Sequence, residues 1–73
     1  MKVFGVNLDG TNQGIVATTS QKKAAALFGV SLYHFQQYGG VAGNASDVEL
    51  AMREPGVAWT KRMLSNDEFR RMP

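Results

Sequence analysis

Cysteine is absent from this chain of 73 residues, and histidine occurs only once. Disulfide bonds and thiolate metal sites are therefore excluded, and a single imidazole cannot form a metal cluster. A chain of this length buries only about 60% of its unfolded surface, so one small core has little stability to spare. Because no cross-link compensates for this, good local structure or a partner chain must do so, and we expect a homo-oligomer.

Long apolar runs are also lacking, since the longest are far shorter than the ~20 residues of a membrane-spanning helix. The first residues, MKVFGVNLDG, hold one lysine and are interrupted by Asn7 and Asp9, so they do not fit a secretory signal. Hydrophobic residues make up 44% and charged residues 19% of the chain, which is a globular composition. We expect a cytoplasmic protein without a membrane partner, in the host cytoplasm if it is viral.

Neither sign of charge dominates, because eight Lys and Arg against six Asp and Glu give a net charge of +2. Most basic residues gather in two places along the chain: Lys22, Lys23, Lys61, Arg62, Arg70 and Arg71. Most acidic residues lie between or beside the second group: Asp47, Glu49, Glu54, Asp67 and Glu68. Two interpretations stay open, a basic edge beside residues 21–39 or an ordinary solvated surface.

Three segments have the alternating, β-branched or aromatic pattern of strands. They are residues 2–8, 15–19 and 57–63. An Asp-Gly pair opens a turn after the first segment and a glycine closes it, so residues 9–14 are predicted to form a hairpin loop. The sequence thus predicts one antiparallel sheet of three strands.

The stretch QKKAAALFGVSLYHFQQYG, residues 21–39, predicts two short helices joined by a tight turn. Thr19 or Ser20 can cap the first helix, and Ser31 can cap the second. Gly29 follows the first apolar run, at the place where glycine adopts a left-handed backbone at no steric cost. We expect two short helices within residues 21–38 with a sharp bend at Gly29.

A third helix is predicted over residues 47–54. Ser46 and Glu49 form a capping box at its start, and Pro55-Gly56 ends it. Residues 1–63 then make one α+β domain with the element order β-β-α-α-α-β. The tail, residues 64–73, is predicted to be a short helix or disordered.

The predicted core follows from the apolar faces of these elements. It comprises Val3 or Phe4, Val6, Ile15, Ala24, Leu27, Phe28, Val30, Leu32, Phe35, Tyr38, Val48, Met52, Val57 and Trp59. The three helices are expected to cover one face of the sheet and to leave the other face open. An open sheet face again suggests a partner chain.

The helical pair resembles the helix-turn-helix of DNA-binding repressors. In that family a small residue stands four positions before the turn glycine, and here Ala25 precedes Gly29 at that spacing. Val30 and Ser31 then match the aliphatic residue and the hydroxyl residue that open the second helix. The small residue lets the two helices cross closely, and the glycine allows the sharp turn.

This resemblance implies a small DNA-binding protein whose second helix lies in the major groove of duplex DNA. The implied base-contacting residues are Ser31, Tyr33, His34 and Gln37, with Gln36 at the margin. The implied phosphate contacts are Lys22, Lys23, Lys61, Arg62, Arg70 and Arg71. The whole chain is also similar to short uncharacterised proteins of tailed bacteriophages, through its hairpin, its KKAAALFGVSLYHF segment and its final strand. The first resemblance implies DNA binding and the second implies a phage origin more than a function, so the expected protein is a phage transcriptional regulator.

A second hypothesis explains the same helix without DNA. An aromatic, amide-rich surface with few charges also suits protein contacts, so the chain could be a phage module that modifies or inhibits a host enzyme or defence complex. Catalysis is not expected, because His34 has no neighbouring cysteine and no obvious triad with Ser31, Asp9 or Asp47. The sequence likewise predicts no cofactor and no metal.

Overall fold

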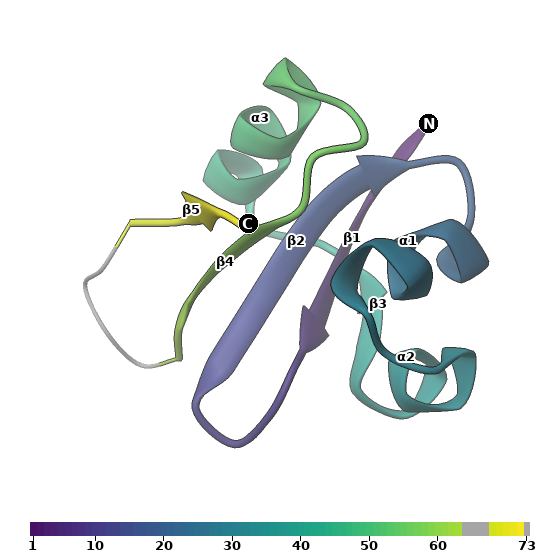
Figure 1. The fold of residues 1–73 in the computed structure, drawn as a ribbon. Helices are drawn as coiled ribbons and strands as arrows, with labels where there is room; N and C mark the ends of the chain where they lie inside the picture. The colour runs from purple at the N-terminus through teal and green to yellow at the C-terminus, as the bar shows by residue number, and fades with distance from the viewer. Residues whose placement is uncertain (64–67, 73) are drawn as a thin grey trace.

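The computed structural model describes residues 1–63 and 68–72 and has the α+β class expected from the sequence. Its strands are β1 (Lys2–Asn7), β2 (Asn12–Thr18), β3 (Gly39–Val41), β4 (Trp59–Arg62) and β5 (Arg70–Arg71). Its helices are α1 (Gln21–Phe28), α2 (Leu32–Tyr38) and α3 (Ala45–Arg53). All strand pairs are antiparallel, and the sheet order is β3-β1-β2-β4-β5 (Figure 1).

The prediction of three strands is wrong, because the sheet has five. Both missed strands are very short and lie at the two edges of the sheet. β3 was expected to be part of a flexible connection, yet it pairs with β1 through Gly40 opposite Gly5. Such pairing uses the main chain alone, so the side chains of a three-residue strand carry little pattern that would predict it.

The tail also differs from the prediction of a short helix or disorder. Arg70 and Arg71 form β5, which pairs with β4 so that Arg71 lies opposite Trp59 and Arg70 opposite Thr60. Residues 64–67 and 73, which belong to the same predicted tail, lie outside the described residues. The strand is stabilised by a partner that is distant in sequence, which local patterns do not reveal.

The predicted hairpin is confirmed, with β1 and β2 in register from Lys2 opposite Thr18 to Asn7 opposite Gln13. Its loop is shorter than expected, because β2 already begins at Asn12. Oδ1 of Asp9 accepts hydrogen bonds from the backbone N–H of Thr11 (2.7 Å) and of Asn12 (2.8 Å). This Asx turn satisfies the loop backbone and allows pairing to resume early.

The sheet is covered on both faces, so the expected open face is wrong. Figure 1 shows α1 and α2 on one side of the sheet and α3 on the other. One cluster joins Phe4, Val6 and Val16 of the sheet to α1 and α2. A second cluster joins Val3, Ile15 and Ala17 to α3. Because both sheet faces are covered, the sheet itself gives no reason to expect a partner chain.

The helix pair has the predicted bounds and the predicted bend. Gly29 has φ 74°, and the N–H of Val30 reaches back to the carbonyl of Ala25 (3.0 Å), as in a Schellman motif. Ser20 caps α1 by accepting from the N–H of Lys23 (3.2 Å), and Ser31 caps α2 through its Oγ. Local signals in the sequence were sufficient here because caps and turns involve residues close together in the chain.

The predicted capping box of α3 is wrong. Asn44, and not Ser46, is the N-cap, because its Oδ1 accepts from the N–H of Ser46 (2.9 Å) and of Asp47 (3.2 Å). The helix consequently begins at Ala45 and places Ser46 within the first turn. Asparagine and serine are comparable N-caps, so two adjacent candidates cannot be separated by residue type alone.

The core prediction is partly correct. Its confirmed members are Val3, Phe4, Val6, Ile15, Ala24, Phe28 and Phe35, while Val30, Val48, Val57 and Trp59 are half-buried. Its wrong members, which are exposed, are Leu27, Leu32, Tyr38 and Met52. Buried hydrophobic residues that the prediction missed are Val16, Ala17, Ala25, Ala51 and Ala58. Since both faces of β2 are covered, this strand is buried continuously from residue 14 to 18.

Two close approaches position the helix pair on the sheet. A Cβ added at Gly14 would lie only 2.5 Å from Cε1 of Phe28, so the aromatic ring rests directly on the strand. Phe35 is fully buried, and its ring meets that of Phe4 edge-on, with centroids 5.9 Å apart. These contacts fix which side of α2 faces the protein.

Candidate nucleic-acid interface

The outward side of α2 follows from the burial of Phe35. With 3.6 residues per turn, the positions two before and two after it point to the opposite side of the helix. These are Tyr33 and Gln37, and Tyr33 is 72% exposed. Gln36 is also exposed and lies on one flank of the same surface. Three of the five predicted base-contacting residues therefore face away from the fold.

The other two predicted base-contacting residues are engaged within the protein. Oγ of Ser31 accepts from the backbone N–H of His34 (3.0 Å), which leaves only its hydroxyl hydrogen to donate. Nε2 of His34 lies 2.8 Å from the carbonyl oxygen of Asn7, and its ring lies 5.0 Å from that of Tyr38. Because a carbonyl oxygen only accepts, Nε2 carries the proton. His34 thus attaches α2 to the end of β1.

The first pair of predicted phosphate contacts lies in the first turn of α1. Lys22 and Lys23 are both exposed, and this turn holds no acidic residue that would neutralise them. Two cations at the positive end of a helix repel its dipole, by a few tenths of a kcal/mol at an exposed site. An external anion at this position would remove that penalty.

The second group of predicted phosphate contacts is divided by the sheet. A Cβ at Gly14 would point at Phe28 of α1, and Thr60 of β4 lies directly opposite Gly14. Thr60 therefore faces the same side as α1 and α2. By alternation along the strand and by pairing with β5, Arg62 and Arg70 face that side too. The predicted set therefore has two members on the side of the helix pair.

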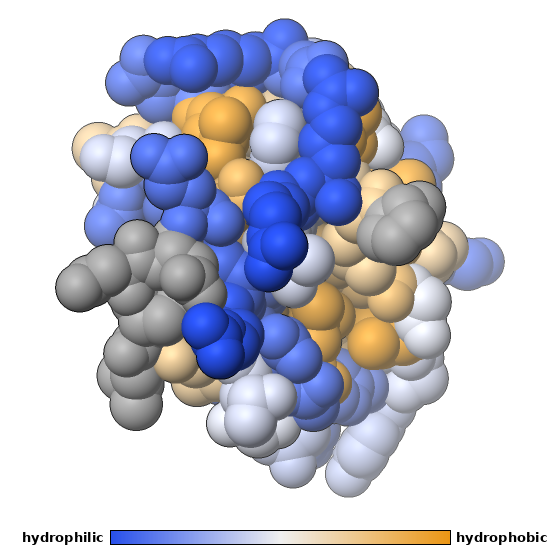
Figure 2. Space-filling view, turned by 60° about the vertical axis from the view of Figure 1, so that its left-hand side comes forward, coloured by the Kyte–Doolittle hydropathy of each residue, from blue (hydrophilic) through white to orange (hydrophobic). Residues whose placement is uncertain are grey.

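The remaining two members of that group face α3 and have partners there. Nζ of Lys61 lies 4.8 Å from the ring centroid of Phe69, and Arg71 pairs with the carboxylate of Glu54 and stacks over Trp59 at 5.6 Å. Figure 2 shows the face nearest to β5, where a strongly hydrophilic band separates two hydrophobic areas. The sequence prediction had combined cations that strand alternation sends to opposite faces.

Acidic residues are distributed unevenly between the two helical layers. The chain from residue 10 to residue 46 contains no Asp or Glu, and this segment includes all of α1 and α2. Asp47 and Glu49 belong to α3, and Glu54 is its C-cap. The layer of α1 and α2 thus carries only positive formal charges, whereas the α3 layer carries most of the described carboxylates.

Asp9 is the described acid that lies near α2. Together with Asn7, Gly10, His34, Tyr38 and Met63, it lines an open hollow of about 530 Å³ between the hairpin loop and the helix. Hydrogen bonds lower its pKa from 3.8 to about 2, first from the N–H of Thr11 and then from the side chain of Asn12. The hydrogen-bond donors of the loop therefore stabilise the ionised form of Asp9.

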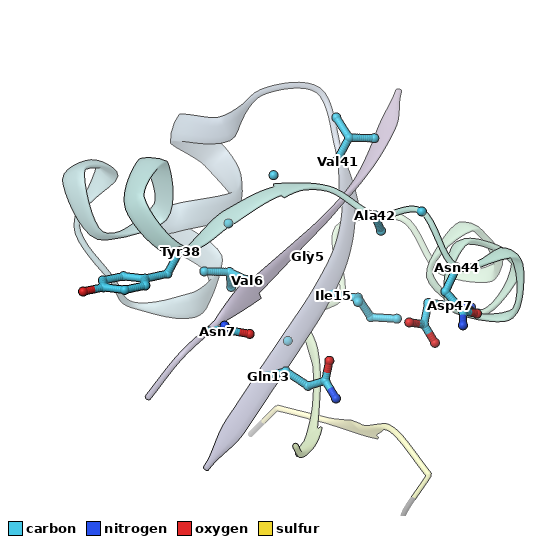
Figure 3. Close-up of a pocket in the computed structure, with 14 residues that line it drawn as sticks. Gly5, Val6, Asn7, Gln13, Ile15, Tyr38, Val41, Ala42, Asn44 and Asp47 are labelled. Carbon is cyan, nitrogen blue, oxygen red and sulfur yellow. The ribbon is translucent and has the colours of Figure 1, made fainter. Parts of the chain in front are cut away.

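A second hollow, of about 270 Å³, opens over Gly5 of β1 and is bordered by residues 39–43 and the start of α3 (Figure 3). Its polar lining includes Asn7, Gln13 and Asp47. Gln13 and Ile15 lie on the same face of β2 as Ala17, so this part of the hollow lies on the α3 side of the sheet. It is separate from the outward surface of α2.

Within residues 1–63 and 68–72, no three side chains of His, Asp or Glu come together in a way that could hold a metal ion. In the same part of the chain, the helices are all too short or too polar to cross a bilayer. A scan against protein-family models found no match, and neither a search of curated proteins nor a search of solved structures found a similar chain.

Proposed function

We propose that this chain binds duplex DNA through the layer of α1 and α2, as a small transcriptional regulator of bacteriophage type. The observation that carries the proposal is the separation of charge across the sheet. The α1–α2 layer has an exposed helix, two exposed lysines and no carboxylate, while the acids of α3 lie on the far side. A surface without carboxylates avoids repulsion by the phosphate backbone.

In this arrangement α2 enters the major groove. Its seven residues span about 10 Å at 1.5 Å per residue, and the groove is about 12 Å wide. Tyr33 and Gln37 then face the base edges with Gln36 beside them. Lys22 and Lys23 at the start of α1, with Arg70 on the same side of the sheet, face the phosphates.

The small number of cations predicts a modest affinity with a measurable salt dependence. Three phosphate contacts give a slope of about −3 in a plot of log K against log salt concentration. Two protomers on adjacent turns of the duplex would double this slope. Fluorescence anisotropy with a mixed-sequence duplex over a salt series measures both the affinity and the slope. Absence of binding at low salt, or a flat salt dependence, contradicts the proposal.

A matched pair of variants tests which layer faces the DNA. Gln37→Glu adds one negative charge to the outward side of α2, and Met52→Glu adds the same charge to an exposed position of α3. We expect Gln37→Glu to weaken binding about tenfold or more and Met52→Glu to leave it nearly unchanged. Equal losses in both variants would mean that binding does not occur through α2.

The two lysines have a separate expected signature. Replacing Lys22 and Lys23 by alanine is expected to weaken binding to every duplex sequence by a similar factor and to make the salt slope shallower by about 2. An unchanged slope would remove these residues from the interface. Circular dichroism of the same variant checks that α1 still forms.

A protein partner is the second candidate, and a specific observation favours it. Leu27, Leu32, Tyr33 and Tyr38, which all belong to α1 or α2, are 40% or more exposed. Apolar and aromatic side chains of this kind are enriched where proteins meet. For this candidate, one stoichiometric host protein should be recovered from nuclease-treated lysate, and Leu32→Asp should abolish the recovery. Recovery that disappears with the nucleic acid contradicts a protein partner.

A further inference from the structure

The outward surface of α2 has a limited set of polar groups that are left without a partner inside the described structure. They are the amides of Gln36 and Gln37 and the hydroxyl of Tyr33, all of which are exposed. The Nε2 of His34 is occupied by the carbonyl of Asn7, and the Oγ of Ser31 accepts the cap of α2, which leaves its O–H as a donor. α2 itself contains no lysine and no arginine.

These groups match the hydrogen-bonding edges of some base pairs better than those of others. Guanine presents two acceptors, N7 and O6, in the major groove, and these are best met by two donors from Arg or Lys. Adenine presents one acceptor and one donor, which match the N–H and the carbonyl of a glutamine amide. A helix that offers amides and lacks a free cationic donor therefore discriminates in favour of adenine.

The apolar part of the same surface matches the partner base. The ring of Tyr33 is largely exposed, and Leu32 is 40% exposed on the flank that also holds Gln36. Thymine carries a C5-methyl group in the major groove, which apolar side chains contact favourably. Side chains suited to adenine and to thymine, the two bases of one pair, therefore lie together on α2.

We propose, on the basis of the DNA binding proposed above, that α2 selects A·T base pairs through direct contacts in the major groove. Tyr33 and Gln37 are separated by about one helical turn, about 6 Å along the surface of the helix, and successive base pairs are 3.4 Å apart. The recognised core is therefore two to three consecutive base pairs for each protomer.

The first test compares two duplexes of equal length that differ only in a central A·T or G·C block, together with selection from a randomised duplex library. We expect about tenfold or stronger preference for the A·T block in the unaltered protein. Equal affinity, or enrichment of G·C blocks, overturns the inference and leaves DNA binding intact. Absence of binding to both duplexes overturns the proposed function as well.

A second test separates direct contacts from a preference for the shape of A·T-rich DNA. Gln37→Ala should reduce the preference several-fold, and replacement of thymine by uracil, which lacks the methyl group, should weaken binding of the unaltered protein. Lys22→Ala is the matched control and should weaken binding to both duplexes alike. If Gln37→Ala and uracil leave the preference unchanged, α2 does not make the selection and the inference is wrong.

Discussion

The two helical layers of this protein are attached to the same sheet in different ways. The α1–α2 layer is held by two aromatic residues, Phe28 and Phe35, which are buried against β1 and β2. The α3 layer is held by Ala51, with Val48 and Leu50 half-buried beside it. One layer therefore combines two large buried anchors with an outer surface that has two lysines and no carboxylate, and the other combines a small anchor with a surface of mixed charge.

The outer surfaces of α3 and α2 differ in their charged side chains. The outer side of α3 carries the ion pair of Glu49 and Arg53 (3.2 Å), a solvent-exposed i, i+4 pair that contributes little stability. α2 exposes Tyr33 on its outer side and Tyr38 beside the hairpin loop, and it contains no Lys, Arg, Asp or Glu. Exposed aromatic side chains without neighbouring charges are typical of a binding surface. Both proposed functions therefore concern α2.

The largest expected effect concerns the anchors of the two layers. Phe35→Ala should lower the free energy of unfolding by about 3–5 kcal/mol, because it removes a fully buried ring and leaves a cavity. A domain of this size has only about 4–11 kcal/mol in total, so much of the variant should be unfolded near 37 °C. Leu50→Ala in the other layer should cost about 1–2 kcal/mol, because its side chain is half-buried. Urea unfolding followed by circular dichroism measures both values, and equal losses would contradict the comparison.

The next effect tests the close approach of α1 to β2. Gly14→Ala places a methyl group 2.5 Å from Cε1 of Phe28 and should cost about 1–3 kcal/mol by overpacking. Gly10→Ala is the control, because its Cβ has no neighbour within 4 Å, and it should change stability by less than about 0.5 kcal/mol. Adding Phe28→Leu to Gly14→Ala should cost less than the sum of the two single changes, because the two residues share one space. Simple additivity in thermal unfolding would mean that they do not touch.

A smaller effect identifies the start of α3. Asn44→Ala should cost about 1 kcal/mol, because the side-chain oxygen of Asn44 accepts two backbone hydrogen bonds. Ser46→Ala should change the free energy of unfolding by less than about 0.5 kcal/mol, because Ser46 lies within the helix. The same urea titrations measure both variants. A reversed order would restore the capping box that the sequence suggested.

The smallest effect concerns Asp9, the acid beside the α1–α2 layer. Its pKa is about 2 in the folded protein and 3.8 in the unfolded reference, so folding favours the ionised form. The resulting stability is fully present above about pH 4 and is lost as the pH falls through 2. Asp9→Asn should lack this component, so its difference from the unaltered protein should shrink between pH 5 and pH 2. A carboxyl titration by NMR with a midpoint near 3.8 would contradict the Asx turn.

The sequence predicted local features of the candidate site well. The bounds of the helix pair, the left-handed Gly29 and the cap at Ser31 are confirmed, and of the two candidates for the first cap, Thr19 and Ser20, the structure has Ser20. Each depends on residues within about five positions of one another, so residue type and spacing carry the information. The outward direction of Tyr33 and Gln37 follows from the same helical period.

Features that depend on distant parts of the chain were predicted poorly. His34 was placed on the outward surface, but it bonds to Asn7, which precedes it by 27 residues. Leu27, Leu32 and Tyr38 were assigned to the core because they are apolar, yet α2 contacts the sheet chiefly through Phe35. The basic residues of β4 and β5 were treated as one set, although strand alternation sends Lys61 and Arg62 to opposite faces.

The α+β class, the hairpin and the bent pair of short helices could be predicted from residue types alone, because hydrophobic period, turn residues and caps act over a few residues. The position of helices on both sides of a five-stranded sheet became clear in the folded chain, since that arrangement depends on burial and on pairings between distant segments. This layering places the carboxylates of α3 on the side opposite to α2, because the sheet lies between the two helical layers.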